Sequence, residues 1–206
     1  GLESTDIREF ISKMDRARPV IMIMFSQRKW NSDRLQRVDS LIEAIEKLGG
    51  TPLPIFLTYA SNKDTGCLGI KDIIDQYLLD NGKSIVDFVI NIITSSITRE
   101  AKIRSADPDD PFLERLGIPV MNSMILVHSY DVWKDDPAGL TNAEIAYSVA
   151  FPEFDGQIIS IPNATTEVDE HGATFYRSID SRINDIANMA MRWALLRRKP
   201  NSEKKI

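Results

Sequence analysis

The chain has 206 residues, of which 43% are hydrophobic and 27% are charged, and its formal net charge at pH 7 is −5. These values are ordinary for a globular protein, and the acidic balance argues against nucleic acid as a partner, because phosphate binding requires a basic face. The single cysteine excludes an internal disulfide and suits a cytoplasmic location, and no apolar run approaches the roughly 20 residues that span a membrane.

The first two thirds of the chain alternate helical and strand patterns. After a short helix over 4–16, the apolar run at 19–25 predicts a strand buried on both faces. An amphipathic helix over 33–48 stops at two glycines. Two prolines either place the next strand, 51–58, near a sheet edge or confine it to a few residues. The remaining expected elements are a helix at 68–79, a strand at 86–93, a short helix at 109–116, a strand at 118–122, and helices at 129–135 and 141–149.

The last third differs in character, with a loop-rich stretch over 151–177 and one long helix over about 178–198. No composition break divides the chain, so we expect one α/β domain over 1–206. It comprises a βαβ core at 19–122 and a helical and loop-rich part at 123–206. The expected fold is a mostly parallel, flavodoxin-like or Rossmann-like three-layer sandwich with a long C-terminal helix.

Arg28, Lys29 and Trp30 follow the first strand, where open α/β sheets bind ligands. The absence of glycine there excludes a dinucleotide or P-loop cradle, because both need close backbone approach. Two cations and an aromatic ring suit a flat anionic ligand. The alternative is a solvated loop with Trp30 packed against the protein.

Other candidate binding residues are Thr94, Ser95 and Arg99, which follow the third strand, and His128. Hydroxyl groups beside an arginine suit a carboxylate or a phosphate, although a capped helix start explains them equally well. His128 lacks neighbours at the spacing of a zinc site, which leaves an acid/base or axial-ligand role or a structural one.

Glu153 and Asp155 are the strongest chemical candidates. On an extended backbone, side chains two positions apart point to the same face. Two carboxylates that share a face repel each other, which favours proton uptake by one of them, and they also suit a hard divalent cation. The alternative is a turn at Asp155-Gly156, with Glu153 facing water.

The long helix ends on a basic cluster formed by Arg192, Arg197, Arg198 and Lys199. The helix macrodipole favours cations at this position. Contact with a neighbouring domain or an acidic partner is the alternative.

An ordered set of short strings resembles the family of cobaltochelatase large subunits and magnesium chelatase H subunits. The resemblance covers most of 19–206, and its most specific part is the last two strings at their observed separation. The strings are GGTPLP at 49–54, VDFVIN at 86–91, LGIPV at 116–120, Trp133, Gly139-Leu140, AFPEFDG at 150–156 and RWALLRRKPN at 192–201.

The resemblance implies a tetrapyrrole-binding subunit that inserts Co²⁺ or Mg²⁺ into a corrin or porphyrin ring, in cobalamin or chlorophyll-type biosynthesis. An AAA+ ATPase subunit and a third subunit would supply ATP hydrolysis. This chain would be one domain excised from a much longer subunit, in contact with its other domains, inactive alone and with no cofactor of its own. Glu153 would be the proton acceptor or metal-delivery ligand, and Asp155 its electrostatic partner.

Two interpretations that assign a different class of function stay open. One is a non-catalytic small-molecule binding or sensor module, in which Arg28, Lys29 and the loop from Thr94 to Arg99 hold an anion. The other is a subunit-docking module that uses the basic helix end.

Overall fold

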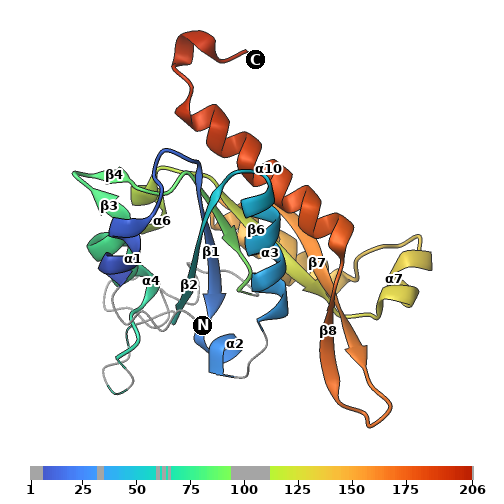
Figure 1. The fold of residues 1–206 in the computed structure, drawn as a ribbon. Helices are drawn as coiled ribbons and strands as arrows, with labels where there is room; N and C mark the ends of the chain where they lie inside the picture. The colour runs from blue at the N-terminus through green and yellow to red at the C-terminus, as the bar shows by residue number, and fades with distance from the viewer. Residues whose placement is uncertain are drawn as a thin grey trace.

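The structure is a computed structural model that describes residues 7–31, 35–58, 61, 64, 66–93 and 112–205. A six-stranded sheet has the order β2-β1-β5-β6-β7-β8 (Figure 1). Its first five strands are parallel, and β8 runs antiparallel to β7. The strands are β1 (Val20–Ser26), β2 (Thr51–Leu57), β5 (Phe88–Asn91), β6 (Val120–Leu126), β7 (Ile158–Val168) and β8 (Thr174–Ser178).

The parallel strands follow the flavodoxin-like order, in which the chain first moves to one side of β1 and then to the other. The predicted fold is therefore confirmed. β2, with its two prolines, is an edge strand as expected, because proline cannot donate to a second neighbour. A separate small hairpin pairs β3 (Leu79–Asp80) with β4 (Lys83–Ser84).

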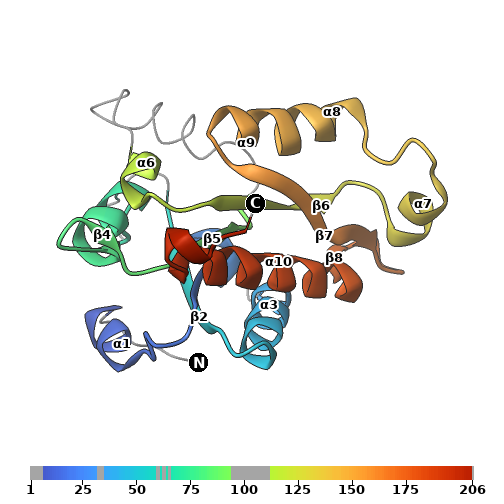
Figure 2. The same cartoon turned by 90° about the horizontal axis from the view of Figure 1, so that it is seen from above.

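Helices cover both faces of the sheet (Figure 2). One face packs against α1 (Ile7–Lys13), α4 (Ile70–Ile73), the π-helical turn η1 (Ile74–Leu78) and α6 (Phe112–Leu116). The other face packs against α3 (Gln36–Lys47) and α10 (Asp180–Arg198). The remaining helical segments are α2 (Gln27–Asn31), α7 (Tyr130–Asp135), α8 (Asn142–Ile145), η2 (Ala146–Ala150), α9 (Phe151–Phe154) and η3 (Asn201–Glu203).

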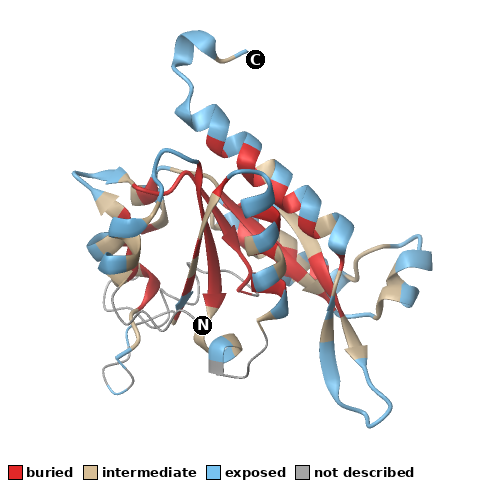
Figure 3. Ribbon diagram, in the orientation of Figure 1, coloured by how far each residue is buried: buried red, intermediate tan, exposed pale blue. Residues whose placement is uncertain are grey.

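Strand β1 contributes to both cores because successive side chains point to opposite faces. Val20, Met22 and Met24 face the first set of helices. Ile21, Ile23 and Phe25 face α3 and α10. Each such burial stabilises the fold by roughly 1.5–3 kcal/mol, and Figure 3 shows the resulting buried layer through the sheet.

The parallel strands define two edges of the sheet. At the carboxyl edge, where the parallel strands end, α2 follows β1 and α7 follows β6. At the amino edge, where they begin, α9 leads into β7. Helix α10 ends at the amino edge, because Arg197 and Arg198 contact Asp87 immediately before β5.

The prediction of a loop-rich stretch over 151–177 is wrong. This stretch contains α9, the long strand β7 and the strand β8. Strand β7 lacks a clear alternation because it pairs with β6 through two register shifts and carries a proline at position 162. The strand predicted at 118–122 is also longer than expected, since β6 continues to Leu126.

Among the described residues, no helix has the length and apolarity needed to cross a membrane.

Candidate functional site

The structure places the predicted site residues in two groups on different elements. Arg28, Lys29 and Trp30 lie in α2, and His128 follows β6, so these residues belong to the carboxyl edge. Glu153 and Asp155 lie directly before β7, whose first residues are level with the end of β5, because Asn122 of β6 pairs with both Asn91 and Ser160.

Helix α2 replaces the loop expected after β1. The Trp30 ring stacks on Phe56 of β2, with centroids 5.4 Å apart and planes 20° apart. The Lys29 ammonium lies 4.1 Å from the centre of the Tyr176 ring, and Arg28 is exposed. Trp30 thus packs against the protein, as in the alternative interpretation, while Lys29 points toward the β8 strand.

Thr94, Ser95 and Arg99 lie outside the described residues. The backbone that leads to them is fixed by Asn91, whose Oδ1 accepts a hydrogen bond of 2.9 Å from the Ile93 N–H. This contact sets the direction in which the chain leaves β5.

His128 is exposed and lies beside Glu144, which is buried. The Glu144 carboxylate accepts hydrogen bonds from the Val127 N–H at 2.7 Å and from the Thr141 N–H and hydroxyl, both at 2.8 Å. Burial acts to raise the pKa of Glu144, but these hydrogen bonds and the charge of His128 outweigh it and lower that pKa. The ionised Glu144 carboxylate thus links the start of α8 to the residue that follows β6 by hydrogen bonds.

Glu153 and Asp155 do not lie on an extended backbone, so that prediction is wrong. Glu153 belongs to α9, which continues η2 without a break, and Asp155 is its C-cap. Pro152 lies inside this continuous helical stretch, directly after the π-helical turn, and Gly156 adopts a φ of +76° that ends the helix. Glu153 is exposed and Asp155 half-buried, and two positions on a helix point to different sides.

A hydrogen-bonded relay leads from Asp155 into the sheet. The Gln157 Nε2 donates to Asp155 Oδ2 over 3.4 Å, and the buried Gln157 Oε1 accepts a 2.9 Å bond from Asn91 Nδ2. The relay connects the turn after α9 to the end of β5. It therefore joins two of the strings on which the family resemblance rests.

A second contact, at the amino edge, joins the string at 86–91 to the string at 192–201. Asp87 is buried and pairs with Arg197 at 3.0 Å and with Arg198 at 2.7 Å. Asp87 also accepts a 2.8 Å bond from the Val20 N–H, and Arg198 donates to the Ala17 carbonyl at 2.7 Å. Arg197 and Arg198 of the basic helix end are thus engaged within the chain, which weakens the proposal that these two residues dock an acidic partner.

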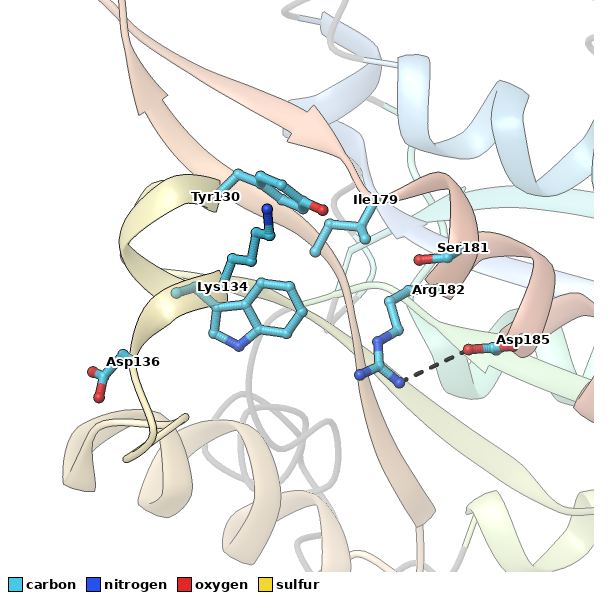
Figure 4. Close-up of a pocket in the computed structure, with 8 residues that line it drawn as sticks. Tyr130, Lys134, Asp136, Ile179, Ser181, Arg182 and Asp185 are labelled. Atoms are coloured by element: carbon cyan, nitrogen blue, oxygen red, sulfur yellow. Dashed lines mark ion pairs between the residues drawn. The ribbon is translucent and has the colours of Figure 1, made fainter.

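A groove of about 470 Å³ opens at the carboxyl edge between α7 and the start of α10 (Figure 4). The Tyr130 and Trp133 rings lie on one side and Arg182 on the other, where it pairs with Asp185 at 3.8 Å. This groove mixes charges of both signs around two aromatic rings. The lining residues are Tyr130, Trp133, Lys134, Asp136, Ile179, Ser181, Arg182 and Asp185.

Within the part of the chain that the structure describes, no three His, Cys, Asp or Glu side chains gather as metal ligands. Glu153 is therefore not part of a preformed metal site among the described residues. The sequence analysis did not identify Asp87, Asn91 and Gln157, which form the buried hydrogen bonds and ion pairs described above. Their only signal in the sequence was that Asp87 and Asn91 belong to the string at 86–91 and that Gln157 directly follows the string at 150–156.

Comparison with known proteins gives a consistent result. A family model described as CobN/Magnesium Chelatase matches residues 3–206. An uncharacterised protein of Methanocaldococcus jannaschii is 28% identical over 93% of this chain and 16% of its own length. The aerobic cobaltochelatase subunit CobN of Pseudomonas aeruginosa is 28% identical over 92% of this chain and 14% of its own length.

A solved structure shares the fold. The catalytic subunit of cobaltochelatase from Mycobacterium tuberculosis superimposes with a TM-score of 0.69 at 24% identity, over 91% of this chain and 15% of that one. The chain thus spans about a sixth or less of the length of the proteins it matches.

Proposed function

The chain belongs to the CobN/magnesium chelatase family, and from that membership we propose that it is one domain of a large chelatase subunit. In this proposal the subunit holds a tetrapyrrole while Co²⁺ or Mg²⁺, the second substrate, enters the ring. The observation that carries the proposal is the family match over nearly the whole chain, residues 3–206.

Exposed apolar side chains around α9 support a domain within a larger subunit. Phe154 is 84% exposed and Tyr147 is 55% exposed, and the Tyr147 ring contacts Phe151 with centroids 5.4 Å apart. Neighbouring apolar groups in water are unfavourable and typically mark a surface that another part of a protein covers. Glu153 lies between Phe154 and this cluster along the chain, so the same partner surface would also bring a ligand to Glu153.

Metal insertion requires two kinds of chemistry that a carboxylate supplies. The ring must lose two pyrrole N–H protons, and the hydrated cation must exchange water for other oxygen ligands. Glu153, exposed and directly before the turn at Gly156, is proposed as the proton acceptor or metal-delivery ligand. Asp155, tied through Gln157 to β5, would add negative charge next to it.

ATP hydrolysis is proposed to occur on partner subunits, one of them an AAA+ ATPase. The support is the match to the CobN/magnesium chelatase family over residues 3–206.

The test replaces Glu153 by Gln in the complete subunit assayed with its partners. We expect the rate of metal insertion to fall about 100-fold, the lower range for loss of a general base, with unchanged affinity for the ring. The matched control is Glu43→Gln, which removes the same charge from an exposed position on α3. A Glu153→Gln subunit that inserts metal at the control rate, with normal ring binding, would contradict the role of Glu153.

A further inference from the structure

Arg37, in the first turn of α3, is a buried cation with an unused donor. Only 3% of its surface is exposed, and its Nη1 donates to Asn163 Oδ1 of β7 over 2.7 Å. Asn163 is itself held by a 2.9 Å bond from its Nδ2 to Ser123 Oγ of β6. The second terminal nitrogen, Nη2, has no hydrogen-bond partner among the described residues.

This arrangement is unusual for a charged group inside a protein. Buried polar atoms are hydrogen-bonded in the great majority of cases, and an unpaired buried charge costs several kcal/mol. Burial lowers the pKa of Arg37 to about 10, so the guanidinium keeps its charge at neutral pH. No carboxylate of the described chain forms an ion pair with it. The fold therefore holds a positive charge in place and leaves one of its donors for an acceptor.

The Tyr176 ring of β8 lies between Arg37 and a second cation. The ring centre is 5.8 Å from the Arg37 guanidinium carbon and 4.1 Å from the Lys29 ammonium nitrogen. Tyr176 is only half-buried, so the cluster reaches the surface through its ring. An aromatic face attracts cations, but more weakly than an anion does, which makes the ring an exchangeable partner for both.

The cluster joins elements that are far apart in the chain and in the sheet. Lys29 lies in the helix that follows β1, and α3 is the next helix along the chain. Their partners Asn163 and Tyr176 come from β7 and β8, at the other end of the strand order from β1 and β2. Two cations from neighbouring helices are thus brought to the same aromatic ring.

We propose that Arg37 and Lys29 form a binding site for the oxyanion group of a small ligand, a carboxylate or a phosphate, with the Tyr176 ring as its cover. One anion oxygen accepts from Nη2 of Arg37 and another from Nζ of Lys29, while the ring turns away. Asn163 and Ser123 hold the guanidinium in the required orientation. Helix α3 and helix α9, which carries Glu153, lie on opposite faces of the sheet (Figure 2), and the site stands independently of the chelatase proposal.

The test is a titration of this chain, followed by NMR at the arginine side-chain N–H signals, with acetate in one series and inorganic phosphate in another. Sodium chloride keeps the ionic strength constant. We expect a saturable shift of the Arg37 signals in at least one series. Arg37→Met and Lys29→Met should each weaken binding at least about 10-fold, as expected for loss of a charge-assisted hydrogen bond.

The matched control is Arg28→Met, which removes the same charge from an exposed position of the same helix as Lys29. It should change the affinity less than about two-fold. Should Arg37→Met fail to fold, the comparison of Lys29→Met with Arg28→Met decides. Saturation by acetate alone identifies a carboxylate site and by phosphate alone a phosphate site. No saturable response to either anion, or equal losses in Lys29→Met and Arg28→Met, would overturn the proposal.

Discussion

The two edges of the sheet differ in how completely their charged groups are paired. At the amino edge, the Asp87 carboxylate receives bonds from two arginines and a backbone N–H. At the carboxyl edge, Arg37 is equally buried but has an unpaired nitrogen. The contrast teaches that the buried charge at the amino edge is matched within the chain, whereas Arg37 keeps one donor, Nη2, without a partner among the described residues.

A substitution at Asp87 should break the amino edge and have the largest effect. Asp87→Asn removes the charge that two arginines share, and we expect a loss of about 3 kcal/mol in the free energy of unfolding. The estimate is at the low end for a buried pair because the Arg197 and Arg198 side chains are 33% and 30% exposed. Denaturant unfolding of the purified chain measures the change.

The control for that variant is Asp75→Asn. Asp75 also pairs with an arginine, Arg115, at 2.9 Å, but its side chain is 39% exposed. Its loss should cost less than about 1 kcal/mol. Equal losses in the two variants would mean that the buried ion pairs of Asp87 stabilise the fold no more than the partly exposed pair of Asp75 does.

Glu144 tests the hydrogen-bonded part of the carboxyl edge through pH. Glu144→Gln should cost about 1–3 kcal/mol at pH 7, because three donors lose a charged acceptor. The pKa of Glu144 is lowered from 4.5, so its stabilisation is fully present above that pH and fades as the pH falls through the lower folded value. The difference in the free energy of unfolding between Glu144→Gln and the unsubstituted chain should therefore be smaller below pH 4.5 than at pH 7.

An exposed glutamate provides the baseline for this pH comparison. Glu43→Gln, on the outer side of α3, should leave stability within about 0.5 kcal/mol at either pH. A Glu144→Gln deficit that stays constant or grows on acidification would contradict the assigned role of the carboxylate.

Gly50 should give the smallest of the three effects and sharpens the description of the amino edge. A Cβ at this position would lie 2.6 Å from Met191 Sδ and 2.7 Å from Ile45 Cγ2. We expect Gly50→Ala to cost about 1–2 kcal/mol by overpacking, since the Met191 and Ile45 side chains must move to make room for the new methyl group. Thermal unfolding measures the loss.

The origin of that loss can be separated from backbone strain. Truncating Met191 to Ala should recover part of the Gly50→Ala deficit. It should recover none of the deficit of Gly49→Ala, where the cost arises from a φ of +80° with no atom within 4 Å of the new Cβ. If Met191→Ala recovers stability in neither the Gly50→Ala nor the Gly49→Ala variant, Met191 is not the side chain that clashes with residue 50.

Much of the fold could be predicted from local pattern. The continuous apolar run at 19–25 and the stripe of α3 led to a buried central strand and a covering helix, and both are present. Strand β7 was missed because its pairing with β6 shifts register twice, which disrupts the alternation of buried and exposed residues.

The candidate site was harder to predict because it depends on contacts between distant residues. Nothing local distinguishes Asp87 from a solvated aspartate until α10 brings Arg197 and Arg198 to it, more than 100 residues later. Arg37 did leave a signal, since it stands four positions before Leu41 on the buried side of α3. Glu153 and Asp155 were assigned to an extended segment because proline and glycine flank them, whereas Pro152 in fact lies inside a continuous helical stretch.

The central claim, that charges at the amino edge fasten α10 to the sheet, is tested most directly by a double-mutant cycle. The cycle combines Asp87→Asn with Arg198→Met and measures the free energy of unfolding of all four proteins. A coupling energy of about 2 kcal/mol is predicted, because Arg198 reaches Asp87 through Nε at 2.9 Å and Nη2 at 2.7 Å. Strictly additive losses, with a coupling near zero, would contradict the claim.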